Sequence, residues 1–238
     1  MVTRTPGSPD IVTTGSTEID KKLGGGIPIG SLVLLEGQSD SGKSVLSQHL
    51  SHGAVTSGMS VAYYTSENTV KSLITQMKSL NLDITDYFLC DRFRIYPIDS
   101  GVREISTEQA FSELINHLKG LPAGFKLAIV DSLTAVVAHS DDQSILDFFA
   151  GCKRLCDQGL TIVAVVHSYA FDERMLIRVG SLCDTRLMLK VEQVGERLIK
   201  IMEVAKVRNA DQFTGNVISF DVEPGLGMKI IPMSKAKA

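Results

Sequence analysis

The chain has 238 residues, with 24 lysine and arginine side chains against 27 aspartate and glutamate side chains, and a formal net charge of −3. Its 44% hydrophobic and 21% charged content excludes a disordered chain, and its length allows a hydrophobic core that needs no disulfide or metal. The balanced charge argues against a dedicated nucleic-acid-binding protein, because such proteins usually carry a basic excess.

Both ends of the chain are short and polar. Residues 1–10 are predicted to be a flexible leader and residues 233–238 a short tail, and no linker or repeat interrupts residues 11–232, so we expect one domain there. The start lacks the apolar run of a secretory signal, and no segment approaches the roughly 18 apolar residues of a membrane span. We therefore expect a cytoplasmic protein that reaches a membrane only through its partners.

The four cysteines form no C-x-x-C pair, which disfavours zinc binding. Buried free thiols are the better interpretation and suit a reducing cytoplasm. The cysteines are Cys90, Cys152, Cys156 and Cys183.

Short apolar strands alternate with helical segments up to about Asp184. Such strands are typical of a parallel sheet covered on both faces. After Asp184, two pairs of strands flank turn residues, which predicts antiparallel hairpins. The sequence therefore predicts an α/β fold with a mostly parallel sheet, helices on both faces and C-terminal antiparallel strands. The expected strands are 31–36, 61–65, 93–98, 126–131, 160–166, 185–193, 196–207, 217–222 and 227–232, and the expected helices are 43–56, 69–80, 107–118 and 145–156.

The strongest chemical signal is a complete G-x-x-x-x-G-K-[ST] phosphate loop between the first strand and the first helix. Its glycines let backbone N–H groups converge on phosphate oxygens, and the helix N-terminus adds partial positive charge. The lysine can reach the β- and γ-phosphates, and the serine hydroxyl can bind Mg²⁺. The alternative is an unrelated glycine-rich turn. The loop consists of Gly37, Gln38, Ser39, Asp40, Ser41, Gly42, Lys43 and Ser44.

A second part of this site is predicted at Asp131, which ends the apolar strand Leu127-Ala128-Ile129-Val130. A carboxylate at the end of such a strand suits the Walker B role of holding Mg²⁺ directly or through water. The alternative is an aspartate that caps the following helix.

Several segments together resemble a known family. Residues 20–31 and 131–133 are similar to those of KaiC-like proteins of the RecA superfamily, and about 11–232 reads as one KaiC-type domain. With residues 76–80 and 147–149, the chain resembles the FlaH family of archaellum accessory proteins. The resemblance implies a RecA-like core that binds ATP and Mg²⁺ and assembles into a ring, expected to be a hexamer. It also implies a secretion-type motor ATPase and a scaffold ring of the archaellum as partners.

The resemblance also implies roles for individual residues. KaiC domains carry two adjacent glutamates where this chain has Glu67 and Asn68, so one carboxylate remains to polarise an attacking water. The alternative for Glu67 is a surface carboxylate that caps the next helix. His167 lies where a RecA-like sensor contacts the γ-phosphate, and a satisfied buried histidine is the alternative.

Lys206 and Arg208 resemble the K-x-R element with which one KaiC subunit approaches its neighbour's γ-phosphate. Period-2 spacing in a strand points both side chains to one face, which suits a clamp acting in trans. The alternative is a pair of solvated charges on an edge strand. Two further patterns are interpreted as structural. His49 and His52 have the spacing of half a metal site, but a metal site there is disfavoured. The acidic residues of 140–142 favour a helix start over calcium binding.

Our primary hypothesis is an ATP-binding accessory component of the archaellum motor, whose nucleotide state regulates ring assembly and docking, with hydrolysis slow or absent. One alternative is an active KaiC-like ATPase, including one that phosphorylates itself. A RecA-type DNA-repair ATPase is disfavoured by the net charge of −3.

Overall fold

The fold is that of a computed structural model, and the structure describes residues 11–98, 106–194, 197–208 and 217–231. The described strands form a nine-stranded sheet in the order β11-β10-β9-β8-β3-β7-β6-β4-β5, beside a small two-stranded sheet of β1 and β2. Strands β8, β3, β7, β6, β4 and β5 are mutually parallel, and β9, β10 and β11 continue the sheet antiparallel. The bounds are β1 Ile11–Val12, β2 Ile27–Pro28, β3 Leu32–Gly37, β4 Ser60–Thr65, β5 Phe93–Pro97, β6 Phe125–Asp131, β7 Thr161–His167, β8 Thr185–Val194, β9 Arg197–Val207, β10 Val217–Glu223 and β11 Gly227–Ile231.

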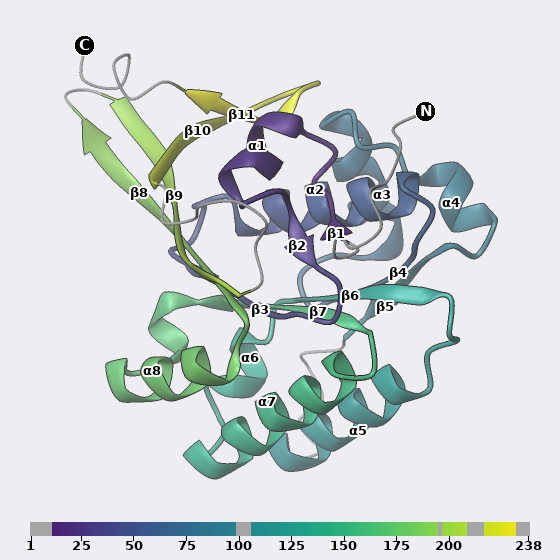
Figure 1. The fold of residues 1–238 in the computed structure, drawn as a ribbon, viewed down its shortest axis with the longest axis vertical. Coiled ribbons are helices and arrows are strands. Elements are labelled where there is room, and N and C mark those ends of the chain that lie inside the picture. The colour runs from purple at the N-terminus through teal and green to yellow at the C-terminus, as the bar shows by residue number, and fades with distance from the viewer. Residues whose placement is uncertain (1–10, 99–105, 195–196, 209–216, 232–238) are drawn as a thin grey trace.

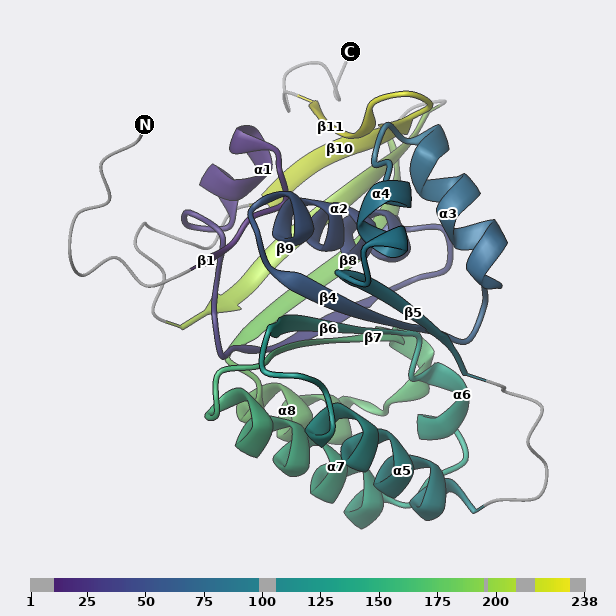
Figure 2. The same ribbon diagram turned by 90° about the vertical axis from the view of Figure 1, so that its right-hand side faces the viewer.

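Helices cover both faces of the parallel part of the sheet (Figures 1 and 2). Helices α1 to α4 lie on one face, and α5 to α8 lie on the other. This layering explains why the central strands are apolar on both sides rather than alternating. The bounds are α1 Thr17–Lys22, α2 Lys43–Thr56, α3 Val70–Ser79, α4 Thr85–Leu89, α5 Thr107–Lys119, α6 Thr134–Val137, α7 Asp142–Cys156 and α8 Glu173–Leu182, with a 3-10 helix η1 at Ser168–Ala170.

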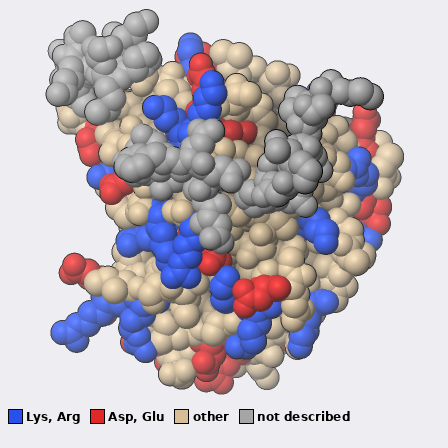
Figure 3. Space-filling view, in the orientation of Figure 1, with Lys and Arg blue, Asp and Glu red and all other residues tan. Residues whose placement is uncertain are grey.

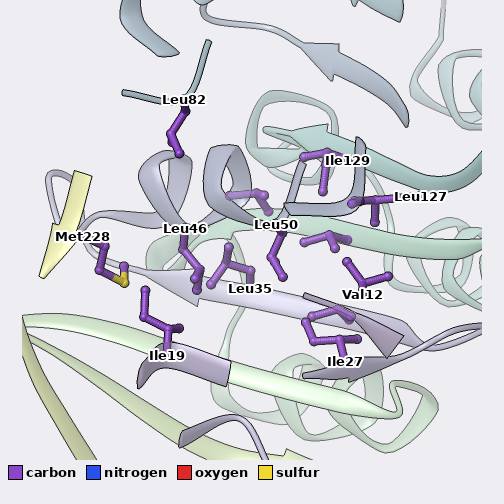
Figure 4. Close-up of a cluster of buried hydrophobic side chains, with 14 of the residues drawn as sticks. Val12, Ile19, Ile27, Leu35, Leu46, Leu50, Leu82, Leu127, Ile129 and Met228 are labelled. Atoms are coloured by element: carbon purple, nitrogen blue, oxygen red, sulfur yellow. The ribbon is translucent and has the colours of Figure 1, made fainter. Parts of the chain in front are cut away.

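Two hydrophobic cores, one on each face of the sheet, fix the helices that flank the candidate site. On the first face, Leu46 and Leu50 of α2 pack with Leu35 of β3 and with side chains of β6 (Figure 4). On the second face, Phe148 of α7 stacks on Phe111 of α5 with ring centroids 4.5 Å apart. Because α2 is packed directly on the sheet, the loop that joins β3 to α2 is held at both ends.

The predicted fold class is confirmed, and each expected strand and helix is present with bounds shifted by a few residues. The sequence analysis did not anticipate the short elements β1, β2, α1, α4 and α6, nor helix α8. Three cysteines are buried free thiols as predicted, but Cys90, which follows α4 at the surface, is exposed. The expected leader 1–10 and tail 233–238 lie outside the described residues.

None of the helices among the described residues is both long enough and apolar enough to cross a membrane.

Candidate nucleotide-binding site

The predicted phosphate loop joins the end of β3 to the start of α2. A Cβ on Gly37 would lie 2.2 Å from the carbonyl oxygen of Leu189 in the neighbouring strand β8, so only glycine fits there. Gly42 is the N-cap of α2 with φ of 95°, a left-handed conformation that side chains rarely adopt. Both glycines of the motif are therefore required by backbone geometry, and the N-terminal N–H groups of α2 are left for a ligand.

Strand β8 holds the loop through Gln38. The Gln38 N–H donates to the Leu189 carbonyl oxygen at 3.3 Å, and the Val191 N–H donates to the Gln38 side-chain oxygen at 3.0 Å. The Ser41 hydroxyl donates to the Gln38 carbonyl oxygen at 2.8 Å. Gln38 is thus bonded through its backbone and its side chain, which keeps the loop in a defined shape.

Lys43 is the central cation of the site. Its Nζ donates to the Gln38 carbonyl oxygen at 2.6 Å and lies 3.5 Å from Nδ1 of His167. No carboxylate of the described residues forms an ion pair with it, although Asp131, Glu67 and Asp40 attract it from a distance. Burial lowers the pKa of the Lys43 ammonium, and these acidic neighbours oppose the shift. A partly buried cation without an ion-pair partner is suited to receive an anion.

Asp131 ends β6 beside the loop and is 4% exposed. The Tyr63 hydroxyl donates to its Oδ2 at 2.7 Å, and the Ser44 hydroxyl lies near the same carboxyl group. Burial raises the pKa of Asp131, and the Tyr63 and Ser44 hydroxyls oppose the rise. The helix-cap alternative does not apply, because α6 begins after Leu133 without a side-chain cap.

The residues present fit a magnesium ion. Mg²⁺ prefers oxygen ligands, usually one or two carboxylates or hydroxyls together with waters and substrate phosphates. The Ser44 hydroxyl and the Asp131 carboxylate supply such a pair at the start of α2. These two residues would hold the ion, and when bound it would neutralise phosphate charge.

Glu67 lies on the loop after β4 and turns toward this site. Its Oε1 accepts from the Ser132 hydroxyl at 3.4 Å and lies 3.8 Å from Nε2 of His167, while its side chain is 54% exposed. Thr69, rather than Glu67, caps α3, and the Asn68 side chain accepts from Ser72 in that helix. The helix-cap alternative for Glu67 is therefore wrong.

His167 ends β7 next to the loop. Its Nδ1 is 3.5 Å from the Ser39 hydroxyl oxygen and 3.5 Å from Nζ of Lys43, and its ring stacks on Tyr169 at 5.3 Å. Burial and the Lys43 charge lower the pKa of His167, while Glu67 opposes the shift. The imidazole is thus grouped with the phosphate-loop residues, as a γ-phosphate sensor requires, although contact with phosphate stays a prediction.

Lys206 and Arg208 lie away from their own phosphate loop. Lys206 pairs with Arg186 at the start of β8, whereas Gly37 pairs with Leu189 further along that strand. Lys206 donates to the carbonyl oxygens of Gly180 and Cys183 at the end of α8, so it is not a freely solvated charge. Arg208 lies 3.6 Å from Asp184 and is 52% exposed. Neither can serve the loop of its own chain, and a role in trans stays a prediction.

Two residues near the site were missed by the sequence analysis. Tyr63 reaches Asp131 from the neighbouring strand, a contact between residues 68 positions apart that no local motif indicates. The Lys200 stem lies 3.8 Å from the position of a Cβ on Gly42, and the Lys200 side chain forms no hydrogen bond or ion pair with the described residues. Only the order of strands β9 and β10 brings it there.

The remaining histidine and acidic patterns have structural roles. The buried His49 accepts the Met228 N–H at its Nε2 at 2.8 Å, and no group of three or more potential metal ligands occurs in the part of the chain that the structure describes. Asp141 caps α7 by accepting from the N–H groups of Gln143 and Ser144, which confirms a helix start at 140–142.

The chain is similar to known ATPases and ATP-binding proteins. A family model described as KaiC ATPase matches residues 12–235. The archaeal flagellar ATP-binding protein FlaH of Sulfolobus acidocaldarius is 31% identical over 232 residues, covering 96% of this chain and 100% of that protein. FlaH of Methanocaldococcus jannaschii is 27% identical over 214 residues, covering 90% of this chain and 91% of that protein. The crystal structure of the flagellar accessory protein FlaH from the same organism matches with a TM-score of 0.82 and 25% identity, covering 94% of this chain and 100% of that one.

Proposed function

Since the chain belongs to the KaiC ATPase family and to its FlaH members, we propose that it binds ATP with Mg²⁺ as an accessory component of the archaellum motor. The bound nucleotide controls assembly into a ring, expected to be a hexamer, and docking to the motor ATPase and scaffold ring. The protein then lies at the cytoplasmic side of the membrane motor, held there by its partners.

The observation that carries this proposal is the state of Lys43. Its ammonium is close to a carbonyl oxygen and an imidazole, but no described carboxylate pairs with it. It lies at the N-terminus of α2, which favours anions, and Ser44 and Asp131 next to it provide oxygen ligands for Mg²⁺. A triphosphate supplies the negative charge that Lys43 lacks, and its magnesium ion supplies a positive charge next to Asp131.

The neighbours of His167 support a nucleotide-dependent control of docking. His167 contacts Ser39 and Lys43 in the loop on one side and stacks on Tyr169 on the other. Tyr169 is 74% exposed on η1. A γ-phosphate that reorders His167 therefore changes an aromatic group that a partner can contact.

The experiment measures ATP affinity, particle mass with and without ATP, and co-sedimentation with the purified motor ATPase. We expect Lys43→Ala to lose ATP binding, the ATP-dependent change in mass and the docking together. Lys229→Ala removes an exposed lysine on β11 and is the matched control, which should behave as wild type. Unchanged docking by Lys43→Ala despite lost ATP binding would contradict the switch.

A second candidate function, ATP hydrolysis, is favoured by the direction of the Glu67 side chain. Its carboxylate faces Ser132 and His167 rather than the start of α3. A positioned carboxylate of this kind can orient and deprotonate water. A turnover of about 1 per second or more that is lost in Glu67→Gln and kept in Asn68→Ala supports an active ATPase. Slow phosphate release that Glu67→Gln does not change contradicts it.

The charge distribution supports protein partners over nucleic acid. On the face drawn in Figure 3, patches of lysine and arginine lie beside patches of aspartate and glutamate. DNA binding usually relies on a continuous basic surface and weakens steeply with salt. Tight, salt-sensitive binding of single-stranded DNA would therefore favour the RecA-type alternative.

A further inference from the structure

Two consecutive tyrosines of β4 point to opposite faces of the sheet and meet different partners. Tyr63 belongs to the core on the α2 face and donates its hydroxyl to Oδ2 of Asp131 at 2.7 Å. Tyr64 belongs to the core on the α5 face, where its hydroxyl oxygen lies 2.7 Å from Nδ1 of His117. The two phenols have the same chemistry, but only Tyr63 contacts the candidate magnesium site.

The position of the Tyr63 hydroxyl is fixed by packing. Tyr63 is 1% exposed, and its ring is stacked on Phe93 of the next strand at 6.3 Å. The register aligns Thr65 with Asp131, which puts Tyr63 two residues earlier on the same face as the carboxylate. A buried phenol on β4, a strand that is paired on both sides, is held apart from the movements of the surrounding loops.

The hydrogen bond restricts what Asp131 can do. A carboxylate can rotate between several orientations, and a donor bound to one oxygen selects among them. With Oδ2 bound by Tyr63, the remaining acceptor sites of Asp131 are left for a cation and for the nearby Ser44 hydroxyl at the start of α2. Residues that hydrogen-bond to a metal-coordinating side chain commonly fix its geometry and tune the affinity of the site for the ion.

We propose that Tyr63 is a positioning residue for the magnesium nucleotide, because its hydroxyl orients the Asp131 carboxylate toward Ser44 and the cation. The inference rests on the proposed function, since it concerns how the same site holds Mg²⁺ with ATP. We expect the phenol itself to touch neither the nucleotide nor the ion. Its removal should therefore affect the contribution of Mg²⁺ and leave the binding of the nucleotide alone unchanged.

The test compares Tyr63→Phe with Tyr64→Phe, which removes the other hydroxyl of the pair and keeps both rings. Binding of a fluorescent ATP analogue is measured in EDTA and over a Mg²⁺ titration. Electron paramagnetic resonance of Mn²⁺ then reports the ion in the nucleotide complex. For Tyr63→Phe we expect unchanged affinity in EDTA, a midpoint for Mg²⁺ that rises about tenfold, and less bound Mn²⁺. Tyr64→Phe should match wild type in all three measurements.

The binding measured in EDTA also reports whether each variant is folded. Tyr63→Phe with a wild-type Mg²⁺ midpoint and wild-type Mn²⁺ spectrum overturns the inference, and so does an equal shift in Tyr64→Phe. A fall in affinity that is the same with and without Mg²⁺ also overturns it, because the hydroxyl would then support the fold rather than the ion. Failure of the wild-type chain to bind ATP contradicts the proposed function itself, which distinguishes the two results.

Discussion

The two ends of the parallel strands both carry clusters of charged side chains, but the charges are balanced in different ways. At the carboxyl end, Lys43 has no ion-pair partner among the described residues, and its Nζ contacts a carbonyl oxygen. At the opposite end, Asp184 binds Lys153 at 2.9 Å, lies 3.6 Å from Arg208, and accepts the Leu32 N–H.

The difference separates a binding site from a structural network. An unpaired, partly buried cation costs stability unless a ligand supplies the opposite charge, so its presence indicates a site for an anion. A carboxylate whose positive neighbours and backbone donor are already in place contributes to the folded state of the chain alone. Substitutions at the first end should therefore alter ligand binding, and those at the second should alter stability.

The largest effect that tests this comparison is expected for Asp184→Asn. The Asp184 side chain is 13% exposed, and a neutral amide removes the negative charge that faces Lys153 and Arg208. Among the described residues, this leaves Lys153 with only its ion pair to Asp157 at 3.0 Å. We expect unfolding in urea to be easier by about 2–3 kcal/mol, with ATP affinity unchanged in the isolated chain. A drop in ATP affinity with unchanged stability would reverse the assignment of the two ends.

The second effect concerns pH and the helix that follows the phosphate loop. Burial lowers the pKa of His49, and a backbone hydrogen bond with Thr14 opposes the shift. The Nε2 of His49 accepts the Met228 N–H, so this nitrogen carries no proton in the folded chain. The unfolded chain therefore binds a proton near pH 6.5 that the folded chain does not. The contribution of His49 to the free energy of unfolding should be constant above this pH and fall as pH drops through it, by up to about 1.4 kcal/mol per pH unit. The free energy of unfolding, measured from about pH 5 to 8, should depend less on pH in His49→Gln. The pKa of His52 is lowered by burial as well, so only the difference between wild type and variant belongs to His49.

The smallest effect is expected for the second cation near the loop. Lys200→Gln should weaken ATP binding by about threefold at low salt and less at high salt, because Lys200 is half-buried and dissolved salt screens its attraction to phosphate. Lys229→Gln is the matched control, since Lys229 is an exposed lysine on β11 that is paired with Glu223. Equal losses in both variants would show that the effect follows net charge rather than position.

The phosphate loop and the layered sheet could be predicted from the sequence, because short local patterns define them. The phosphate loop is fixed by backbone requirements at Gly37 and Gly42, and such requirements are visible as glycines at set spacing. Short apolar segments such as β7 predicted a sheet covered on both faces. Helix α8 was missed although it has one apolar face, and Cys90 was expected to be buried although α4 leaves it at the surface.

The contacts that refine the site could not be predicted, because they depend on strand order and register. Tyr63 meets Asp131 only because β4 and β6 are neighbours in a particular register. Lys200 reaches the loop only because β9 and β10 extend the sheet past β8. The pairing of Lys206 and Arg208 with the end of α8 and with Asp184 likewise joins segments that no motif connects.

The most direct test of the unpaired cation is a calorimetric titration of wild type and Lys43→Ala with MgATP. We predict that wild type binds one nucleotide per chain and that Lys43→Ala binds at least about a hundredfold more weakly, since charge-assisted hydrogen bonds to phosphate are lost. Its urea unfolding should be unchanged or slightly stabilised, because a desolvated charge is removed. Wild-type affinity in Lys43→Ala, or no binding by wild type, would contradict the assignment of this end of the sheet as the nucleotide site.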